Sequence, residues 1–106
     1  MKKVSLSGFD KYCHGLANPR FVFDAQNQTY IHSSPYMSGV QSYDRIHISY
    51  APGSIWFFTS NHTGYMLLSG VREVLIDNNA FDHSTIVQVV CSSGTEESEL
   101  FTFLVE

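Results

Sequence analysis

Positive charge is scarce in this chain. Its 106 residues include three lysines and three arginines, and Arg20, Arg45 and Arg72 stand far apart in the sequence. Nucleic-acid binding depends on clustered cations that release counterions from the phosphate backbone. Because the net charge is −4 and no cationic cluster is present, we expect no nucleic acid among the partners.

Long apolar runs are absent too. No stretch approaches the roughly 20 residues of a transmembrane helix, so we expect no membrane partner. The opening residues MKKVSLSGFD contain two lysines but lack the apolar centre of a signal peptide. Cys13 and Cys91 are too few to form a disulfide framework. We therefore expect a cytoplasmic protein with two reduced thiols.

Charged residues of either sign are few, and sheet-forming residues take their place. Charged residues make up 15% of the chain, below the roughly 25% of a typical soluble domain. Aromatic residues reach 14%, and aromatic and uncharged polar side chains suit pleated sheets better than exposed helices. The length fits one hydrophobic core. We expect a single β domain over residues 1–106.

Short apolar runs separated by turn residues fill most of the chain. Their spacing is typical of antiparallel sandwiches and barrels, and no run of ten or more residues has a convincing helical period. Parallel strands would need crossovers for which the sequence has no room. The sequence therefore predicts an all-β fold, either a small antiparallel barrel or a two-sheet sandwich of about eight strands.

Individual elements follow from the same pattern. Alternation at the beginning predicts a first strand over KVSLSGF, followed by an irregular segment with at most one helical turn before Gly15. Gly70 is expected to mark a bulge or sharp bend between two strands. The remaining predictions are two strands in 20–34 with a turn near 25–28, a loop over 34–44, a hairpin over 45–59, and a terminal hairpin over Thr85–Glu106.

The stretch DKYCHG places a carboxylate, a thiol and an imidazole within five residues. A cysteine nucleophile needs a nearby base and a group that orients the base. Adjacent residues diverge in both strands and helices, so Cys13 and His14 are poorly placed for each other, and His83 is the more plausible distant base. In a helical turn Asp10 and His14 would share a face as an ordinary surface contact. A cysteine-dependent enzyme using Cys13 is the least favoured hypothesis.

Metal and cofactor signatures are missing. The five histidines stand more than five residues apart, and no Cys-x-x-Cys or His-x-His occurs. We expect the histidines to face solvent. The alternative is a metal site assembled across neighbouring strands from His32 and His47. The chain also lacks a phosphate-binding glycine loop and a serine nucleophile elbow. We expect no metal, no cofactor and no catalytic residue.

Aromatic residues gather around the central hairpin, and Trp56 lies at their centre. Because Ile55 and Phe57 alternate with Trp56 and Phe58, both faces of this strand are apolar. One face then needs a second sheet, another subunit or a ligand to cover it. If the cover is a small apolar molecule or a sugar, the ligand-binding residues are predicted to be Trp56, Phe58, Tyr65, His47 and Gln88.

These observations favour a non-catalytic binding or assembly module. Few charges protect its strand edges from pairing with other chains, and symmetric homodimers are the commonest oligomers. We therefore expect self-association through apolar strand faces or edges, as a homodimer or another homo-oligomer. The alternative function is a β-barrel that binds a small ligand in an aromatic pocket around Trp56.

Overall fold

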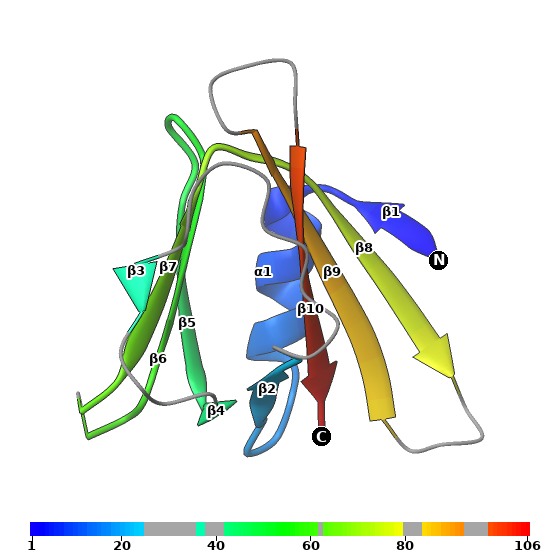
Figure 1. The fold of residues 1–106 in the computed structure, drawn as a ribbon. Coiled ribbons are helices and arrows are strands. Elements are labelled where there is room, and N and C mark those ends of the chain that lie inside the picture. The colour runs from blue at the N-terminus through cyan, green and yellow to red at the C-terminus, as the bar shows by residue number, and fades with distance from the viewer. Residues whose placement is uncertain (25–35, 38–41, 62, 80–83, 93–97) are drawn as a thin grey trace.

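The fold was analysed in a computed structural model, which describes residues 1–24, 36–37, 42–61, 63–79, 84–92 and 98–106. Two antiparallel sheets face each other, and one helix lies between them (Figure 1). The sheets are not closed into a barrel. The all-β prediction is confirmed, and of its two architectures the structure shows the sandwich.

The six-stranded sheet is built from both ends of the chain. Its strands in spatial order are β1 (Lys2–Val4), β8 (Val71–Asn79), β9 (Ser84–Ser92), β10 (Ser98–Val105), β2 (Phe21–Phe23) and β4 (Ser42–Tyr43). The predicted terminal hairpin is confirmed, because β9 and β10 pair from Ser92 opposite Ser98 to Thr85 opposite Val105. β10 therefore lies inside the sheet, with β9 on one side and β2 on the other.

The four-stranded sheet comes from the middle of the chain. Its strands in spatial order are β3 (Tyr36–Met37), β7 (Tyr65–Ser69), β6 (Ser54–Phe58) and β5 (Arg45–Ser49). The hairpin predicted over 45–59 is confirmed, and its register places His47 opposite Trp56. Short strands β3 and β4 lie where a loop was expected over 34–44, so that expectation is wrong for these four residues.

Helix α1 (Leu6–His14) replaces the second half of the predicted first strand. The helix begins after Ser5, whose Oγ accepts a hydrogen bond from the backbone N–H of Gly8 at 3.0 Å, as an N-cap residue does. Phe9 and Cys13, four residues apart, face the core. Val4 and Leu6 match the period of a strand. From Leu6 onward, however, the N-cap and the buried helical positions favour a helix. The prediction of one helical turn at most before Gly15 is therefore wrong.

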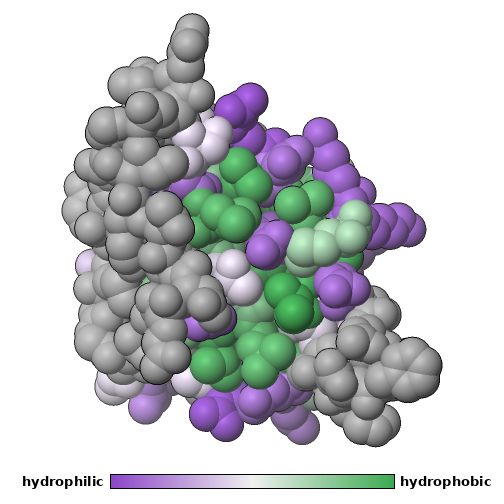
Figure 2. Space-filling model, turned by 45° about the vertical axis from the view of Figure 1, so that its right-hand side comes forward, coloured by the Kyte–Doolittle hydropathy of each residue, from purple (hydrophilic) through white to green (hydrophobic). Residues whose placement is uncertain are grey.

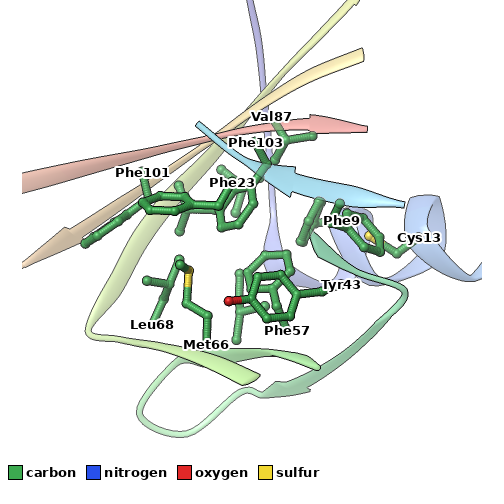
Figure 3. Close-up of a cluster of buried hydrophobic side chains, with 14 of the residues drawn as sticks. Phe9, Cys13, Phe23, Tyr43, Phe57, Met66, Leu68, Val87, Phe101 and Phe103 are labelled. Atoms are coloured by element: carbon green, nitrogen blue, oxygen red, sulfur yellow. The ribbon is translucent and has the colours of Figure 1, made fainter. Parts of the chain in front are cut away.

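The core is a cluster of aromatic and aliphatic side chains between the sheets (Figure 3). Phe57 of β6 and Phe103 of β10 stack across it, with ring centroids 4.3 Å apart. Phe21 meets Phe57 edge-on at 5.7 Å, in one of the arrangements that aromatic pairs prefer. Phe9 and Cys13 add the helix to the same cluster. The inward-facing side chains of the strands around Phe57 are therefore buried in the core.

The chain passes from one sheet to the other at Gly70. Its φ of +66° lies in the left-handed region, which glycine adopts at little cost. Its carbonyl oxygen accepts a hydrogen bond of 2.7 Å from the N–H of Ser92, and the register with β9 then shifts between Val71 and Glu73. The predicted bend and bulge are confirmed, and they mark the corner that joins β7 to β8.

Candidate functional site

Four of the five residues predicted to bind a ligand lie together on the outer face of the four-stranded sheet. In β6, Ile55 and Phe57 are buried, so Trp56 and Phe58 point away from the core. The register places His47 of β5 beside Trp56, and Tyr65 of β7 beside Phe58. The outward residues of three neighbouring strands therefore form one surface.

These side chains border a shallow hollow of about 450 Å³. The rings of Trp56 and Tyr65 are 5.7 Å apart between centroids and tilted by 41°. Trp56 is 37% exposed and Tyr65 is 41% exposed, so a molecule in the hollow reaches both rings. We call this surface the aromatic hollow; it is lined by His47, Trp56, Phe58, Gly64 and Tyr65.

The turn between β6 and β7 fixes one end of the hollow. Thr59 Oγ1 accepts hydrogen bonds from the backbone N–H groups of Thr63 at 3.0 Å and Gly64 at 3.1 Å. Thr63 Oγ1 in turn donates to Asn61 Oδ1 at 2.7 Å. Side-chain to backbone bonds of this kind hold a turn in one conformation. Gly64 is therefore held at the end of the hollow.

Gln88 does not join the other four residues. It lies in β9, opposite Thr102 of β10, and alternates with Val87 and Val89, which are buried. Gln88 was predicted to lie near Trp56, but it faces outward from the six-stranded sheet and so away from the four-stranded sheet. The structure thus places Gln88 on a different surface from Trp56.

A second apolar surface covers the outside of the six-stranded sheet. Hydrophobic side chains gather over this sheet, with polar groups around and between them (Figure 2). Ile86 and Leu100 are each 38% exposed there, and their outward neighbours are half-buried. We call this surface the aliphatic face; its outward-facing members are Val22, Leu75, Ile86, Val90, Leu100 and Leu104.

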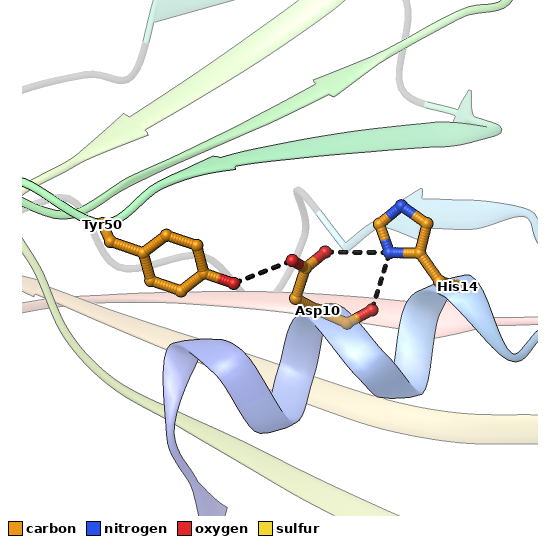
Figure 4. Close-up of polar contacts among 3 residues, drawn as sticks. All are labelled: Asp10, His14 and Tyr50. Atoms are coloured by element: carbon orange, nitrogen blue, oxygen red, sulfur yellow. Dashed lines mark hydrogen bonds and ion pairs between the residues drawn. The ribbon is translucent and has the colours of Figure 1, made fainter.

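The reactive residue types of DKYCHG are separated by the helix. His14 Nδ1 lies 2.8 Å from Asp10 Oδ1, and Tyr50 Oη donates to Asp10 Oδ2 at 2.7 Å (Figure 4). Because a carboxylate only accepts hydrogen bonds, Nδ1 of His14 carries a hydrogen in this contact. The predicted Asp10–His14 surface pair is confirmed. Through Tyr50, it ties α1 to the chain beyond β5.

Cys13 points the other way, into the core. It is 5% exposed, and burial together with the nearby Asp10 charge raises its pKa. A nucleophilic cysteine needs the opposite, an accessible thiol with a lowered pKa. His83, the proposed distant base, lies outside the described residues. The geometry around Cys13 therefore opposes the cysteine-enzyme hypothesis.

Within the described ranges, no three His, Cys, Asp or Glu side chains come together in a way that would hold a metal ion. His47 lies beside Trp56 on the outer face of β6. His32, its predicted partner in a site across strands, falls outside the described residues.

The two buried thiols make stability depend on pH. Burial, with a smaller effect of Glu99, raises the pKa of Cys91 from 9.0 to about 12, and the pKa of Cys13 moves in the same direction. The folded chain thus holds these protons more tightly than the unfolded chain does. Stability is fully present below pH 9.0 and falls as the pH rises above it, by at most about 1.4 kcal/mol per pH unit and thiol.

Urea unfolding at about pH 8 and about pH 10 tests this dependence. We expect a lower midpoint at the higher pH, and a smaller drop for the double variant Cys13→Ala/Cys91→Ala. Part of the drop remains in that variant because burial also raises the pKa of Tyr43. An equal drop in both proteins would contradict the assignment to the thiols.

Comparison of the chain with protein-family models, curated proteins and solved structures found no match. Among the described residues, no helix has the length and apolar character needed to cross a membrane. Sequence reasoning expected an apolar strand face but did not identify the residues of the aliphatic face, and it did not single out Arg45, which the register places opposite Phe58. The alternation of Ile86, Gln88 and Val90 carried a signal for the aliphatic face, because two of these three outward residues are apolar.

Proposed function

We propose that the chain is a non-catalytic assembly module that forms a symmetric homodimer through the aliphatic face. The observation that carries this proposal is the set of six aliphatic residues on the outside of a sheet whose inner side is already packed. Burying such side chains is the main favourable term in protein association. A second copy offers the same face in return, as a two-fold interface requires.

The dimensions of the sheet suit a dimer interface. β9 has nine residues and β10 has eight, which at roughly 3.4 Å per residue gives strands about 27 Å long. Six strands spaced by about 4.8 Å make the face about 24 Å wide. The projected area of roughly 600 Å² approaches the roughly 800 Å² that each partner buries in a standard interface.

Charges of both signs lie around the aliphatic face, and two ion pairs join some of them. Lys3 Nζ lies 3.1 Å from Glu73 Oε2 towards the β1 side, and Arg20 Nη1 lies 3.5 Å from Glu106 Oε2 near β2. Each pair places one positive and one negative group near the rim. These pairs therefore add no net charge that would oppose a second copy.

The strand edges are less suitable for self-association. Within the described chain, the six-stranded sheet ends in β1 and β4, of three and two residues, and β3 has only two residues. Short edge strands are a common protection against pairing between chains. The fourth edge, β5, has α1 packed against it. These features favour dimer formation through the face.

A reducing compartment suits this protein. Cys13 and Cys91 are both buried free thiols. We place it in the cytoplasm, where thiols stay reduced.

Light scattering during size-exclusion chromatography tests the dimer. We expect a mass of about 24 kDa, twice the 12.0 kDa of one chain. Leu100→Glu is expected to raise the dimer dissociation constant by at least about 100-fold, because the symmetry places the unpaired charge in the interface twice. The matched control is Trp56→Glu, at an apolar residue of similar exposure on the other sheet, and it should leave the dimer intact.

A monomer at all concentrations would overturn the proposal. A dimer lost in Trp56→Glu and kept in Leu100→Glu would instead place the interface on the four-stranded sheet. Circular dichroism of both variants separates these outcomes from a failure to fold.

A further inference from the structure

The aromatic hollow exposes two neighbouring rings, tilted by 41° to each other, against which an aromatic ligand can pack. Trp56 and Tyr65 present neighbouring, partly exposed rings on adjacent strands. Aromatic rings stack well on such platforms, with roughly 1–3 kcal/mol for each stacked ring. The hollow is shallow and open, which fits a planar molecule lying on the sheet.

The charge on this face has one sign. Arg45 lies beside Phe58 in the same cross-strand row, just outside the lining of the hollow, and His47, which lines it, lies beside Trp56 in the next row. Arg45 is exposed and makes no ion pair with any described residue. The described outward residues of β5, β6 and β7 include no carboxylate: Arg45, His47, Ser49, Ser54, Trp56, Phe58, Tyr65, Leu67 and Ser69. Although the protein has a net charge of −4, the described outward residues of these three strands therefore favour an anion.

We propose that the aromatic hollow binds a small aromatic anion, whose ring lies on Trp56 and Tyr65 and whose anionic group meets Arg45. Arg45 supplies a planar set of donors that matches a carboxylate. The site goes beyond the proposed dimer, because it lies on the other sheet and does not depend on self-association.

Two other occupants fit this face less well. A second copy would bring two Arg45 rows together, and the described outward residues of β5 to β7 supply no carboxylate between them, so like-charge contacts oppose binding. A neutral sugar would leave the Arg45 guanidinium without an anionic partner. The face therefore favours a ligand that is both aromatic and negatively charged.

Benzoate is a suitable probe, and Trp56 is a built-in reporter because it is the chain's single tryptophan. We expect benzoate to change the Trp56 fluorescence with a Kd on the order of 1 mM, as a small molecule in an open site allows. Benzamide, which keeps the ring without the charge, should bind about fivefold more weakly. Cyclohexanecarboxylate and glucuronate, which keep the charge without the aromatic ring, should bind about tenfold more weakly.

Two variants separate the contributions of charge and ring. Arg45→Gln is expected to weaken benzoate binding about fivefold and to leave benzamide binding unchanged. Trp56→Leu, followed through the amide signals of β5 to β7 by NMR, should weaken both about tenfold. Arg72→Gln is the matched control, because Arg72 is an exposed arginine of the six-stranded sheet, and it should change neither.

Several outcomes would overturn the inference. Equal affinity for benzoate and benzamide removes the role of Arg45, and equal affinity for glucuronate removes the role of the rings. A short oligothymidylate that bound more than tenfold tighter than benzoate would make the face a nucleic-acid surface instead. Benzoate binding to Leu100→Glu is expected to match the unchanged protein, so this site and the proposed dimer succeed or fail separately.

Discussion

Replacing Phe57 by alanine is expected to lower the free energy of unfolding by about 3–5 kcal/mol. Phe57 has no exposed surface, and its ring contacts three others, from Phe103 at 4.3 Å to Phe21 at 5.7 Å and Tyr43 at 6.4 Å. These partners come from β10, β2 and β4 of the opposite sheet. The substitution would therefore open a cavity at the point where the two sheets meet.

Phe58→Ala is the matched control, because it removes the same ring from the next position of the same strand. Phe58 faces outward and is only half-buried, so we expect a loss of about 1 kcal/mol. Urea unfolding followed by circular dichroism measures both losses. Equal losses would show that the two faces of β6 contribute alike, which contradicts the observed packing.

Gly70→Ala is expected to cost about 3 kcal/mol at the corner between the sheets. The φ of +66° strains any residue with a side chain. An added Cβ would also lie 2.8 Å from the carbonyl oxygen of Ser92, a backbone atom of β9 that cannot turn aside. Relief of this clash requires the corner to move away from β9, which weakens the 2.7 Å hydrogen bond between Ser92 N–H and Gly70 O.

Gly15→Ala provides the control for the corner. Gly15 follows α1 with φ −82°, and an added Cβ there meets Lys11 O at an ordinary 3.4 Å. We expect no loss of stability, and a gain of about 0.5 kcal/mol from the reduced freedom of the unfolded chain. If thermal unfolding showed the two alanine variants to be equally stable, the corner would not be strained.

The sequence predicted elements where one side of a strand is consistently apolar. Val87 and Val89 alternate with polar or exposed positions and pair with β10 as expected. The bend at Gly70 and the turn that ends at Gly53 could also be predicted, because turn residues interrupt clear strand patterns at both places. The aromatic hollow followed from the same logic, since Trp56 and Phe58 had to face away from Ile55 and Phe57.

Features that depend on the pairing of strands distant in the sequence could not be predicted from the sequence. Gln88 was predicted to lie near Trp56, but the sheet to which Gln88 belongs depends on the pairing of β9 with β8 and β10. Glu99 follows two other glutamates in a polar segment of the sequence, yet it starts the inward row of β10 and is 3% exposed. The helix was missed because its nine residues overlap a short strand-like alternation. Each error arose where local pattern and tertiary context disagree.

The internal place of β10 has a consequence for the synthesis of the chain. Residues 21–23 leave the ribosome early but pair with β10, where Phe21 meets Val105, and β1 likewise waits for β8, where Lys2 meets Ile76. Contacts so distant in sequence form slowly. The six-stranded sheet cannot be completed during translation until β10 has emerged, so until then β2 has only β4 as a strand neighbour and β1 has only β8.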